Sequence, residues 1–393
     1  MGGNNPVNSK PQKLDSESVT DGDRPRAAFI STPALWRNGF GGKHPLKPQR
    51  LARTVALLEA YGAFDAANVS RINPPLATDE ELQLFHTPDY IDAVRALSAG
   101  ETPATPAREF GLGVGDNPIF RGMNKISRLK VGGGLAGARL LLEGTCSVAF
   151  NFSGGLHHAR PSQASGFCIF NDVAVAIHWL LTQGQRVAYV DIDAHHGDGV
   201  QAAFDDTDQV LTISLHQDGR TLFPGTGFVD EIGYGRGEGF SVNVPLDPGT
   251  DDETYLWAFR ELVPPLVSRF APDVLVTQLG VDTHYLDPLT HMGLTTTGHI
   301  ALFRELAALS PGKWLTCGGG GYNLDVVARS WTLAFGAMSG QEFPDALPEA
   351  YRDQYGGQWL RDREGPVLDE RSRSRIRHQA EKTVVDVKAR MGL

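Results

Sequence analysis

The chain contains 393 residues, of which 41% are hydrophobic, and its formal net charge is −10. A chain of this length and composition can bury the core of one large domain or of two ordinary domains. The acidic balance provides no general attraction to nucleic acid or to an anionic membrane surface. No apolar segment approaches the roughly 18 residues that span a bilayer, and no secretory signal opens the chain. We therefore expect a cytoplasmic globular protein that binds neither nucleic acid nor a membrane.

The three cysteines, Cys146, Cys168 and Cys317, are widely spaced and form no CxxC pair. This usage predicts neither a disulfide framework nor a thiolate zinc site, and it is typical of a reducing compartment.

Composition divides the chain into three parts. Residues 1–26 are rich in Asn, Ser, Asp, Lys and Pro and poor in apolar side chains, which predicts a disordered leader. Residues 27–340 contain no linker and no internal repeat, so we expect one domain there, and it should carry the chemistry. Residues 341–393 include a charged helical pattern from Glu370 to Met391 and are expected to form a helical appendage packed on that domain.

In the central region, short apolar segments alternate with segments of helical apolar spacing. We expect strands at 27–32, 148–152, 187–193, 210–216, 240–244, 273–280 and 313–317. Helical spacing occurs at 51–61, 90–97, 135–142, 173–181, 253–270 and 300–309. This alternation predicts an α/β fold: a single domain with a mainly parallel central sheet of about eight strands, flanked by helices on both faces.

Reactive residues follow four of the predicted strands. His157 and His158 come after 148–152, Asp191 to Asp198 end 187–193, Asp282 follows 273–280, and Tyr322 follows 313–317. Ligand sites of parallel sheets lie at the carboxyl ends of the strands. We therefore expect one site, at this edge of the sheet.

Asp193 and His195 are two positions apart where a strand ends, so in an extended chain both side chains can point the same way. Carboxylate and imidazole are good zinc ligands, and a catalytic zinc keeps three protein ligands and an open position. Asp282 is the candidate third ligand because the same edge presents it. The alternative interpretation is that the DxDxHH segment merely caps a helix.

His157 and His158 lie in the segment GGLHHA. One of them can act as a general base while the other stays charged, provided that carboxylates set their tautomers. Asp191 and Asp198, which flank the metal segment, are the candidate partners. An isolated pair of histidines is more often an ordinary surface or capping pair, but the neighbouring metal segment favours the catalytic interpretation.

Tyr322 follows four glycines, which would let its phenol donate a hydrogen bond to a developing oxyanion. The alternative is a glycine-rich turn with a packed tyrosine. Gly166, Phe167 and Phe223 are candidates for a narrow apolar slot, because glycine leaves room and aromatic faces hold an alkyl chain. Taken singly, these three residues are more typical of a core than of a substrate slot.

With these residues the chain resembles the histone deacetylase family, and in particular its bacterial acetoin-utilisation branch. The resemblance extends from about Ala27 to Gly340. It rests on the segments HPLKPQR, GLHHA, GFCIFND, DIDAHHGDGVQ, FPGTG, GVDTHYLDPL and GGGGYN, which occur in the order of the family. It implies an arginase/deacetylase-like fold and zinc-dependent hydrolysis of the amide of N-epsilon-acetyl-lysine, which releases acetate and free lysine.

The resemblance also implies roles for individual residues. Zinc would be bound by Asp193, His195 and Asp282. His157 would pair with Asp191, and His158, the proton shuttle, with Asp198, while Tyr322 polarises the acetyl carbonyl. The acyl-lysine tunnel would be formed by Gly166, Phe167, Phe223, Leu289 and Gly320, with Asp116 at its mouth and Arg50 beside the acetate exit route.

Two structural K⁺ or Na⁺ ions are implied as well. One would use Asp191, Asp193, His195, Ser214 and Leu215, and the other Phe204, Thr207, Val210 and Phe240. Ferrous iron accepts the same ligands as zinc at the main site, so the sequence does not separate the two metals. The expected partner is an acetylated protein or peptide, with an acetyl-CoA-forming metabolic enzyme as one candidate. The sequence predicts no oligomeric state.

Three other functions compete with this one. An arginase-like enzyme with two manganese ions needs carboxylates where Gly197 and His284 stand. An acetylpolyamine deacetylase would attract its dicationic substrate with an acidic group at the tunnel mouth, where Leu289 stands. A catalytically silent acyl-lysine binding module would not need both histidines and Tyr322.

Overall fold

The structure, a computed structural model, describes residues 26–37 and 39–393. The leader expected at 1–26 lies outside these residues except for Arg26. The described strands are β1 (Ala27–Ile30), β2 (Val69–Ile72), β3 (Val148–Asn151), β4 (Val187–Asp191), β5 (Val210–Gln217), β6 (Ser241–Leu246), β7 (Val274–Gln278) and β8 (Trp314–Cys317).

The helices connect these strands and cover them. They are α1 (Ala34–Arg37), α2 (Gln49–Ala60), α3 (Asp79–Leu82), α4 (Pro88–Ala99), α5 (Met123–Leu142), α6 (Asp172–Thr182), α7 (Asp198–Phe204), α8 (Asp252–Phe270), α9 (Thr296–Leu309), α10 (Leu324–Ser339), α11 (Glu349–Tyr355) and α12 (Glu370–Met391), with short 3₁₀ turns at Ala107–Phe110 and Gly235–Gly237. None of the helices in the described part of the chain combines the length and apolar character needed to cross a bilayer.

The described strands form one parallel sheet in the order β2-β1-β3-β8-β7-β4-β5-β6. The predicted α/β fold with a parallel sheet of about eight strands is thus confirmed. The four strands expected to carry the reactive residues, β3, β8, β7 and β4, are adjacent at the centre of the sheet. Their carboxyl ends therefore meet at one place.

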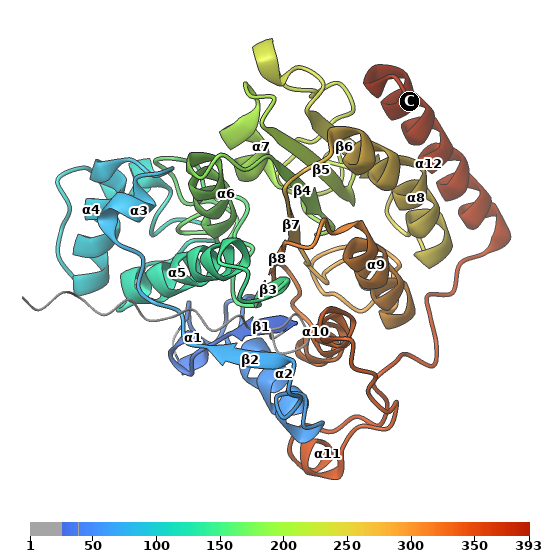
Figure 1. The fold of residues 1–393 in the computed structure, drawn as a ribbon, viewed down its shortest axis with the longest axis horizontal. Helices are drawn as coiled ribbons and strands as arrows, with labels where there is room; N and C mark the ends of the chain where they lie inside the picture. The colour runs from blue at the N-terminus through green and yellow to red at the C-terminus, as the bar shows by residue number, and fades with distance from the viewer. Residues whose placement is uncertain (1–25, 38) are drawn as a thin grey trace, which may run out of the picture.

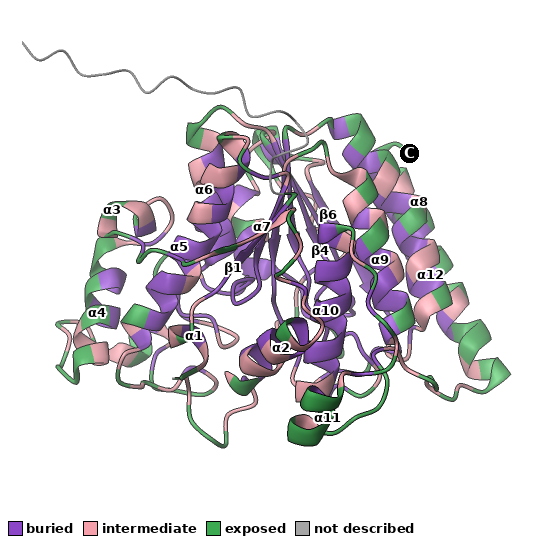
Figure 2. Cartoon of the chain, turned by 60° about the horizontal axis from the view of Figure 1, so that its bottom comes forward, coloured by how far each residue is buried: buried purple, intermediate pink, exposed green. Residues whose placement is uncertain are grey.

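Two layers of helices enclose the sheet (Figure 1). Helices α5, α6 and α7 lie on one face, and α2, α10, α9 and α8 lie on the other. Side chains alternate between the faces, as strand geometry requires: in β1, Ala28 and Ile30 join the core under α5 and α6, whereas Ala27 and Phe29 join the opposite core. Figure 2 shows the buried strands between these two layers.

An aromatic cluster fills the core between the sheet and α10. Phe150 of β3 is fully buried, and its ring centroid lies 5.8 Å from that of Phe29 and 6.4 Å from that of Trp331. We expect Phe150→Ala to lower the free energy of unfolding by about 3–5 kcal/mol, because it removes buried area and leaves a cavity. Urea denaturation measures the change. The control is Val367→Ala, at a residue 99% exposed, which should change stability by less than about 0.5 kcal/mol.

Besides the short helices α1, α3, α7 and α11, which were not predicted, three longer or sheet-forming elements differ from the sequence expectations. Strand β2 was not predicted, because it is a short edge strand whose side chains are only partly buried. Helix α10 was not predicted, because nearly every residue of it is buried and it lacks the polar face of an amphipathic pattern. Helix α5 begins at Met123 rather than at 135, and the glycines at 132–134 obscured its first half.

Those glycines have a packing role. A Cβ at Gly132 would lie 1.9 Å from the carbonyl oxygen of Pro75, and one at Gly133 would lie 2.5 Å from Asn151 Oδ1. Close approach of α5 to the loop at Pro75 and to Asn151 of β3 therefore requires glycine at these two positions. Lys130, one turn before Gly134, is half-buried and lines a cavity.

The C-terminal helix α12 contacts β6 and α8. Thr383 Oγ1 donates to the carbonyl oxygen of Pro245 at 3.2 Å, and Arg269 Nη1 donates to that of Met391 at 2.7 Å. Ile376, Val384 and other apolar residues of one helix face are buried there. The division into leader, domain and appendage stays a prediction.

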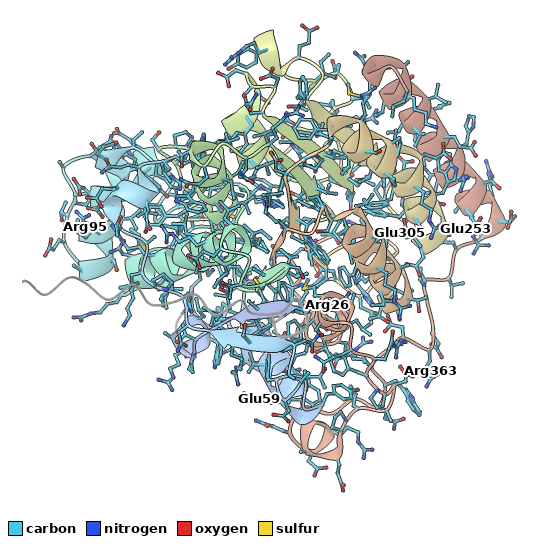
Figure 3. The ribbon with its side chains drawn as sticks, viewed as in Figure 1. Arg26, Glu59, Arg95, Glu253, Glu305 and Arg363 are labelled. Carbon is cyan, nitrogen blue, oxygen red and sulfur yellow. The ribbon has the colours of Figure 1, made fainter. Side chains whose placement is uncertain are left out.

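Charged side chains at the periphery form ion pairs with one another. Glu59, labelled in Figure 3, lies 2.8 Å from Arg71, and Arg363 lies 2.5 Å from Asp345. Exposed pairs of this kind contribute at most about 1 kcal/mol each, so stability depends mainly on the two apolar cores.

His86, at the end of the turn that follows α3, makes stability depend on pH. It is buried; its Nε2 accepts from the backbone N–H of Asn171 at 2.9 Å and its Nδ1 faces the carbonyl oxygen of Pro161 at 3.2 Å. Burial lowers the pKa of His86 to about 4, so between pH 6.5 and 4 the unfolded chain binds a proton that the folded chain refuses. Stability is therefore lost as the pH falls through this window.

We expect His86→Gln to reduce this pH dependence. Between pH 7 and pH 5, unfolding free energies should fall by about 2 kcal/mol less in the variant than in the wild type, since one pKa unit corresponds to about 1.4 kcal/mol. Equal pH dependence in urea titrations of the two proteins would show that His86 does not titrate as inferred.

Candidate active site

Three potential metal ligands converge at the carboxyl ends of β4 and β7. Asp193 and His195 follow β4, and Asp282 follows β7; all three side chains are buried. His195 Nδ1 lies 3.1 Å from Asp193 Oδ1 and 3.0 Å from Asp282 Oδ2. One ligand atom from each residue lies within 4.8 Å of the others, so the three could hold a single metal ion.

Further contacts hold the two carboxylates in place. Asp193 Oδ2 accepts from Gln278 Nε2 at 2.6 Å and from the backbone N–H of Gly320 at 2.7 Å. Asp282 Oδ1 accepts from the backbone N–H of Ala194 at 2.9 Å. Outer contacts of this kind orient metal ligands and tune their basicity.

The buried carboxylates of Asp193 and Asp282 favour the binding of a cation. Burial and the neighbouring Asp193 raise the pKa of Asp282 to about 7. The two carboxylates raise the pKa of His195 to about 10 against the effect of burial. Two buried carboxylates and one imidazole are a donor set that suits zinc or ferrous iron, and the residues present fit such an ion.

Each histidine of the adjacent pair contacts a carboxylate. His157 Nδ1 lies 2.8 Å from Asp191 Oδ2, and His158 Nδ1 lies 2.7 Å from Asp198 Oδ1. Tyr189 donates to Asp191 Oδ2 at 2.6 Å, and this hydroxyl helps to hold the carboxylate. The structure thus brings together both pairs that the resemblance implies.

These contacts determine which ring nitrogens of His157 and His158 carry protons. Each Nδ1 faces a carboxylate and therefore carries a proton. The Nε2 atoms of His157 and His158 lie 3.0 Å apart, so one of them must donate to the other, and that ring is an imidazolium. Burial and the charge of His157 lower the pKa of His158 to about 4, whereas Asp191 raises that of His157 to about 9 despite burial. His157 is therefore the cation, and His158 is neutral with a basic Nε2.

Asp172, at the start of α6, positions the loop that carries both histidines. Its carboxylate accepts from the backbone N–H of Gly155 at 3.0 Å and of Leu156 at 2.8 Å. Asn151 Nδ2 donates to the same carboxylate at 3.2 Å. The sequence argument did not identify this residue, although it lies in the quoted segment GFCIFND.

Tyr322 lies beside the metal ligands. Its ring centroid is 6.4 Å from that of His195, and its backbone N–H donates to Asp287 Oδ2 at 2.8 Å. Burial and the carboxylates of Asp282 and Asp193 raise the pKa of the Tyr322 phenol well above its usual value. The hydroxyl therefore keeps its proton at neutral pH and can act as a donor.

Aromatic side chains and a glycine form the walls of the approach to this cluster. The Phe223 ring centroid lies 5.0 Å from that of His158, and the Phe167 centroid lies 5.7 Å from that of Tyr322. A Cβ at Gly166 would lie 2.3 Å from His158 Cδ2, so only glycine fits there. Phe167 has a φ of +66°, a strained conformation that is concentrated at functional sites.

The other predicted substrate residues do not all lie at the cavity that contains the histidines. A Cβ at Gly320 would lie 2.0 Å from Asp282 Oδ2, which places Gly320 against the metal ligands. Asp116 lines a surface hollow that also includes Phe167. Leu289 is half-buried and donates its backbone N–H to Asp287 at 2.9 Å, but it does not line the cavity that contains the histidines.

Arg50, at the start of α2, contacts the glycine segment that precedes Tyr322. It is buried, and its Nη1 donates to the carbonyl oxygens of Gly319 at 2.7 Å and Gly321 at 3.2 Å. Its guanidinium carbon lies 5.0 Å from the ring centroid of Trp331. These contacts fix Arg50 beside the glycine segment that precedes Tyr322.

The residues predicted for monovalent cations lie close together, but several of their oxygens have other partners. Asp191 and Ser214 face each other in the β4–β5 register. The carbonyl oxygen of Leu215 accepts from Tyr255, and that of Phe240 accepts from the N–H of Thr212. Both cation sites stay predictions.

A second metal ion has no ligands at the positions where an arginase-like site would need them. A Cβ at Gly197 would lie 2.4 Å from Asp191 Oδ2, so a larger side chain does not fit. His284 contacts Asp362 at 2.8 Å through Nε2 and accepts from the N–H of Leu286 through Nδ1. Both of its nitrogens are therefore engaged.

The chain is similar in sequence to known deacetylase-family proteins. The family profile described as "Histone deacetylase domain" matches residues 44–338. The acetoin utilization protein AcuC of Bacillus subtilis is 41% identical over 353 residues, which cover 83% of this chain and 90% of that protein. Histone deacetylase 19 of Arabidopsis thaliana is 39% identical, with coverage of 86% of this chain and 67% of that protein.

Solved structures agree with this similarity. The crystal structure of a histone deacetylase homologue from Aquifex aeolicus superposes with a TM-score of 0.84 at 33% sequence identity, covering 92% of this chain and all of that one. A structure of a homologue in complex with SAHA has the same TM-score and identity.

Proposed function

Because the chain belongs to the histone deacetylase family, we propose that it hydrolyses the amide of N-epsilon-acetyl-lysine in proteins or peptides, with zinc held by Asp193, His195 and Asp282. Acetate and a free lysine side chain are the products. The proposed location is the cytoplasm, and the proposed substrates include an acetyl-CoA-forming enzyme.

One observation carries the proposal: a neutral histidine and a charged histidine, each fixed by its own carboxylate, stand beside a cluster of metal ligands. His158 and Asp193 line the same cavity as Phe167 and Tyr322. A binding module needs no such pair, whereas amide hydrolysis needs a base, an acid and a stabilised oxyanion.

The residues of the chain divide the chemistry among themselves. A metal ion at the cluster would supply Lewis acidity and lower the pKa of water toward about 7. His158 exchanges the hydrogen bond from His157 for one from the attacking water, takes the water's proton at Nε2, and returns it to the departing lysine nitrogen. Tyr322 donates its hydroxyl hydrogen to the developing oxyanion, and the His157 cation stabilises that negative charge without moving a proton.

The walls of the cavity suit a neutral, extended acyl-lysine side chain. Phe167 and Phe223 offer aromatic faces to the methylene groups, and Gly166 leaves room between them. A free polyamine would carry a further positive charge, and this chain has the half-buried Leu289 at the position where an acetylpolyamine deacetylase would have an acid. Acetyl-lysine is therefore preferred over acetylpolyamines.

The test is a comparison of substrates at equal concentration with metal-loaded protein: an acetyl-lysine peptide, acetylspermidine, acetylputrescine and arginine. We expect the peptide to give the highest kcat/KM. Faster hydrolysis of either polyamine would replace the proposed substrate class, and urea released from arginine would favour the arginase-like alternative. Binding of the peptide without hydrolysis of any substrate would favour the silent binding module.

A further inference from the structure

Lys130 is a positively charged residue near Arg50 that takes no part in the proposed hydrolysis. Lys130 of α5 is half-buried and lines a cavity. Its carbonyl oxygen accepts from Asn151 Nδ2 at 2.9 Å, whereas its Nζ has no hydrogen-bond or ion-pair partner among the described residues. A half-buried ammonium without a partner leaves a positive charge that an anion can balance.

Lys130 lines a cavity of about 40 Å³ that is also lined by Arg50, Ser127 and Ser153. A single water molecule needs only ~10–15 Å³, so a ligand larger than water fits. The charged residues among the described lining residues are all basic, and the rest of the wall is mostly apolar. The cavity thus presents positive charge and hydroxyl donors without an acidic partner.

This cavity adjoins the one that contains the catalytic histidines. The two share Leu46, Arg50, Leu156 and Phe167 as lining residues. Leu156 immediately precedes His157, and Arg50 contacts the glycine segment before Tyr322. The shared side chains therefore form the boundary between the reaction centre and the cavity that Lys130 lines.

The electrostatics favour an anion in this position. Burial and the nearby charge of Arg50 lower the pKa of Lys130 to about 8, although Asp172 opposes this effect. Lys130 and Asp172 form no ion pair within 4.0 Å, and the Asp172 carboxylate is occupied by backbone N–H groups of the histidine loop. An anion in the cavity would relieve the repulsion between the two cations.

We propose that Lys130, together with Arg50, forms a binding site for a small carboxylate behind the reaction centre. The resemblance implies an acetate exit beside Arg50 only; the role of Lys130 is an addition to it, and it rests on the proposed hydrolysis. The carboxylate has two sources: the acid released by the reaction, or the free end of a dicarboxylic acyl group still attached to lysine. In both cases water adds to the amide carbonyl, the C–N bond breaks, and the nitrogen leaves with a proton.

The first arm of the test measures inhibition by acetate. Metal-loaded wild type is compared with Lys130→Met, Lys130→Arg and the control Lys125→Met, which removes an exposed lysine from the same helix. Since a charge-assisted hydrogen bond is lost, the inhibition constant for acetate should rise about tenfold in Lys130→Met and much less in Lys130→Arg and Lys125→Met. Neutral acetamide should not inhibit comparably.

The second arm measures hydrolysis of a succinyl-lysine peptide relative to the acetyl-lysine peptide. If the occupant is the end of a dicarboxylic acyl group, wild type cleaves the succinyl peptide and Lys130→Met loses this activity selectively. If it is the released acid, only the acetate arm responds. Acetate inhibition and succinyl cleavage that are both unchanged in Lys130→Met would overturn the proposal, because acetate would then bind at the metal alone.

A third measurement is independent of turnover. Line broadening of ¹³C-labelled acetate by metal-loaded wild type should be reduced in Lys130→Met, and circular dichroism shows whether this variant is folded. If Lys130→Met does not fold, Lys130→Gln replaces it. Absence of hydrolysis together with Lys130-dependent broadening would refute the proposed function and leave the carboxylate site standing; equal broadening in both proteins would refute the site.

Discussion

Replacing His158 by alanine is expected to lower kcat for an acetyl-lysine peptide by about 100- to 10,000-fold, the usual contribution of a positioned general base. The contacts with Asp198 and His157 leave His158 as the neutral ring of the pair. His157→Ala should lower kcat as well, because it removes the cation beside the oxyanion, but the metal content of both variants should match that of the wild type.

The control for this prediction is His378→Ala, which removes an exposed histidine from α12. It should leave kcat unchanged. Steady-state kinetics with zinc content measured on the same samples provide the comparison. Wild-type kcat in zinc-loaded His158→Ala would contradict the assignment of the base, and a zinc-free variant would show that His158 acts mainly through the metal site.

The second large effect is expected on zinc affinity when the proposed ligand Asp282 is replaced. Asp282→Ala should weaken zinc binding by more than about 100-fold, because loss of an outer contact of a metal ligand alone costs 10- to 100-fold. The variant should stay folded without metal, since burial and Asp193 already disfavour the charged Asp282 carboxylate in the metal-free protein. Activity should then depend on added zinc at concentrations far above those that the wild type needs.

Competition with a chromogenic chelator measures this affinity, and Asp230→Ala, which removes an exposed carboxylate, is the matched control. Unchanged zinc affinity in Asp282→Ala would exclude Asp282 as a ligand. Loss of affinity together with loss of the folded state would instead indicate that Asp282 is needed for the structure, and Asp282→Asn would then separate the two effects.

The sequence predicted the central part of the fold well, for a physical reason. Strands that are covered on both faces, such as β4 and β7, appear as continuous apolar segments. Each ends abruptly where polar ligands begin. The edge strand β2 and the fully buried helix α10 lack a distinctive pattern, and only their neighbours in the folded chain determine their structure.

The candidate site was predicted in its principal residues but not in its supporting contacts. Asp193, His195 and the two histidines stand in short segments whose spacing indicates metal and acid–base chemistry. Gln278, Asp172 and Asp287 support these residues from distant parts of the chain, and a lone amide or carboxylate gives no local signal of such a contact.

The surroundings of Lys130 could not be predicted from the sequence either. In the sequence it is one more lysine in a helical segment, indistinguishable from Lys125 five residues earlier. Only the folded structure shows that Lys130 lines a cavity together with Arg50.

We propose that a metal ion at Asp193, His195 and Asp282 enables hydrolysis of acetyl-lysine. Removal and restoration of the metal test this proposal. Purified protein is treated with a chelator, dialysed, and assayed for acetate release from an acetyl-lysine peptide with and without one equivalent of zinc or ferrous iron. We expect no measurable release from the metal-free protein and recovery on addition of the metal. Full activity in protein shown to be free of metal would contradict it.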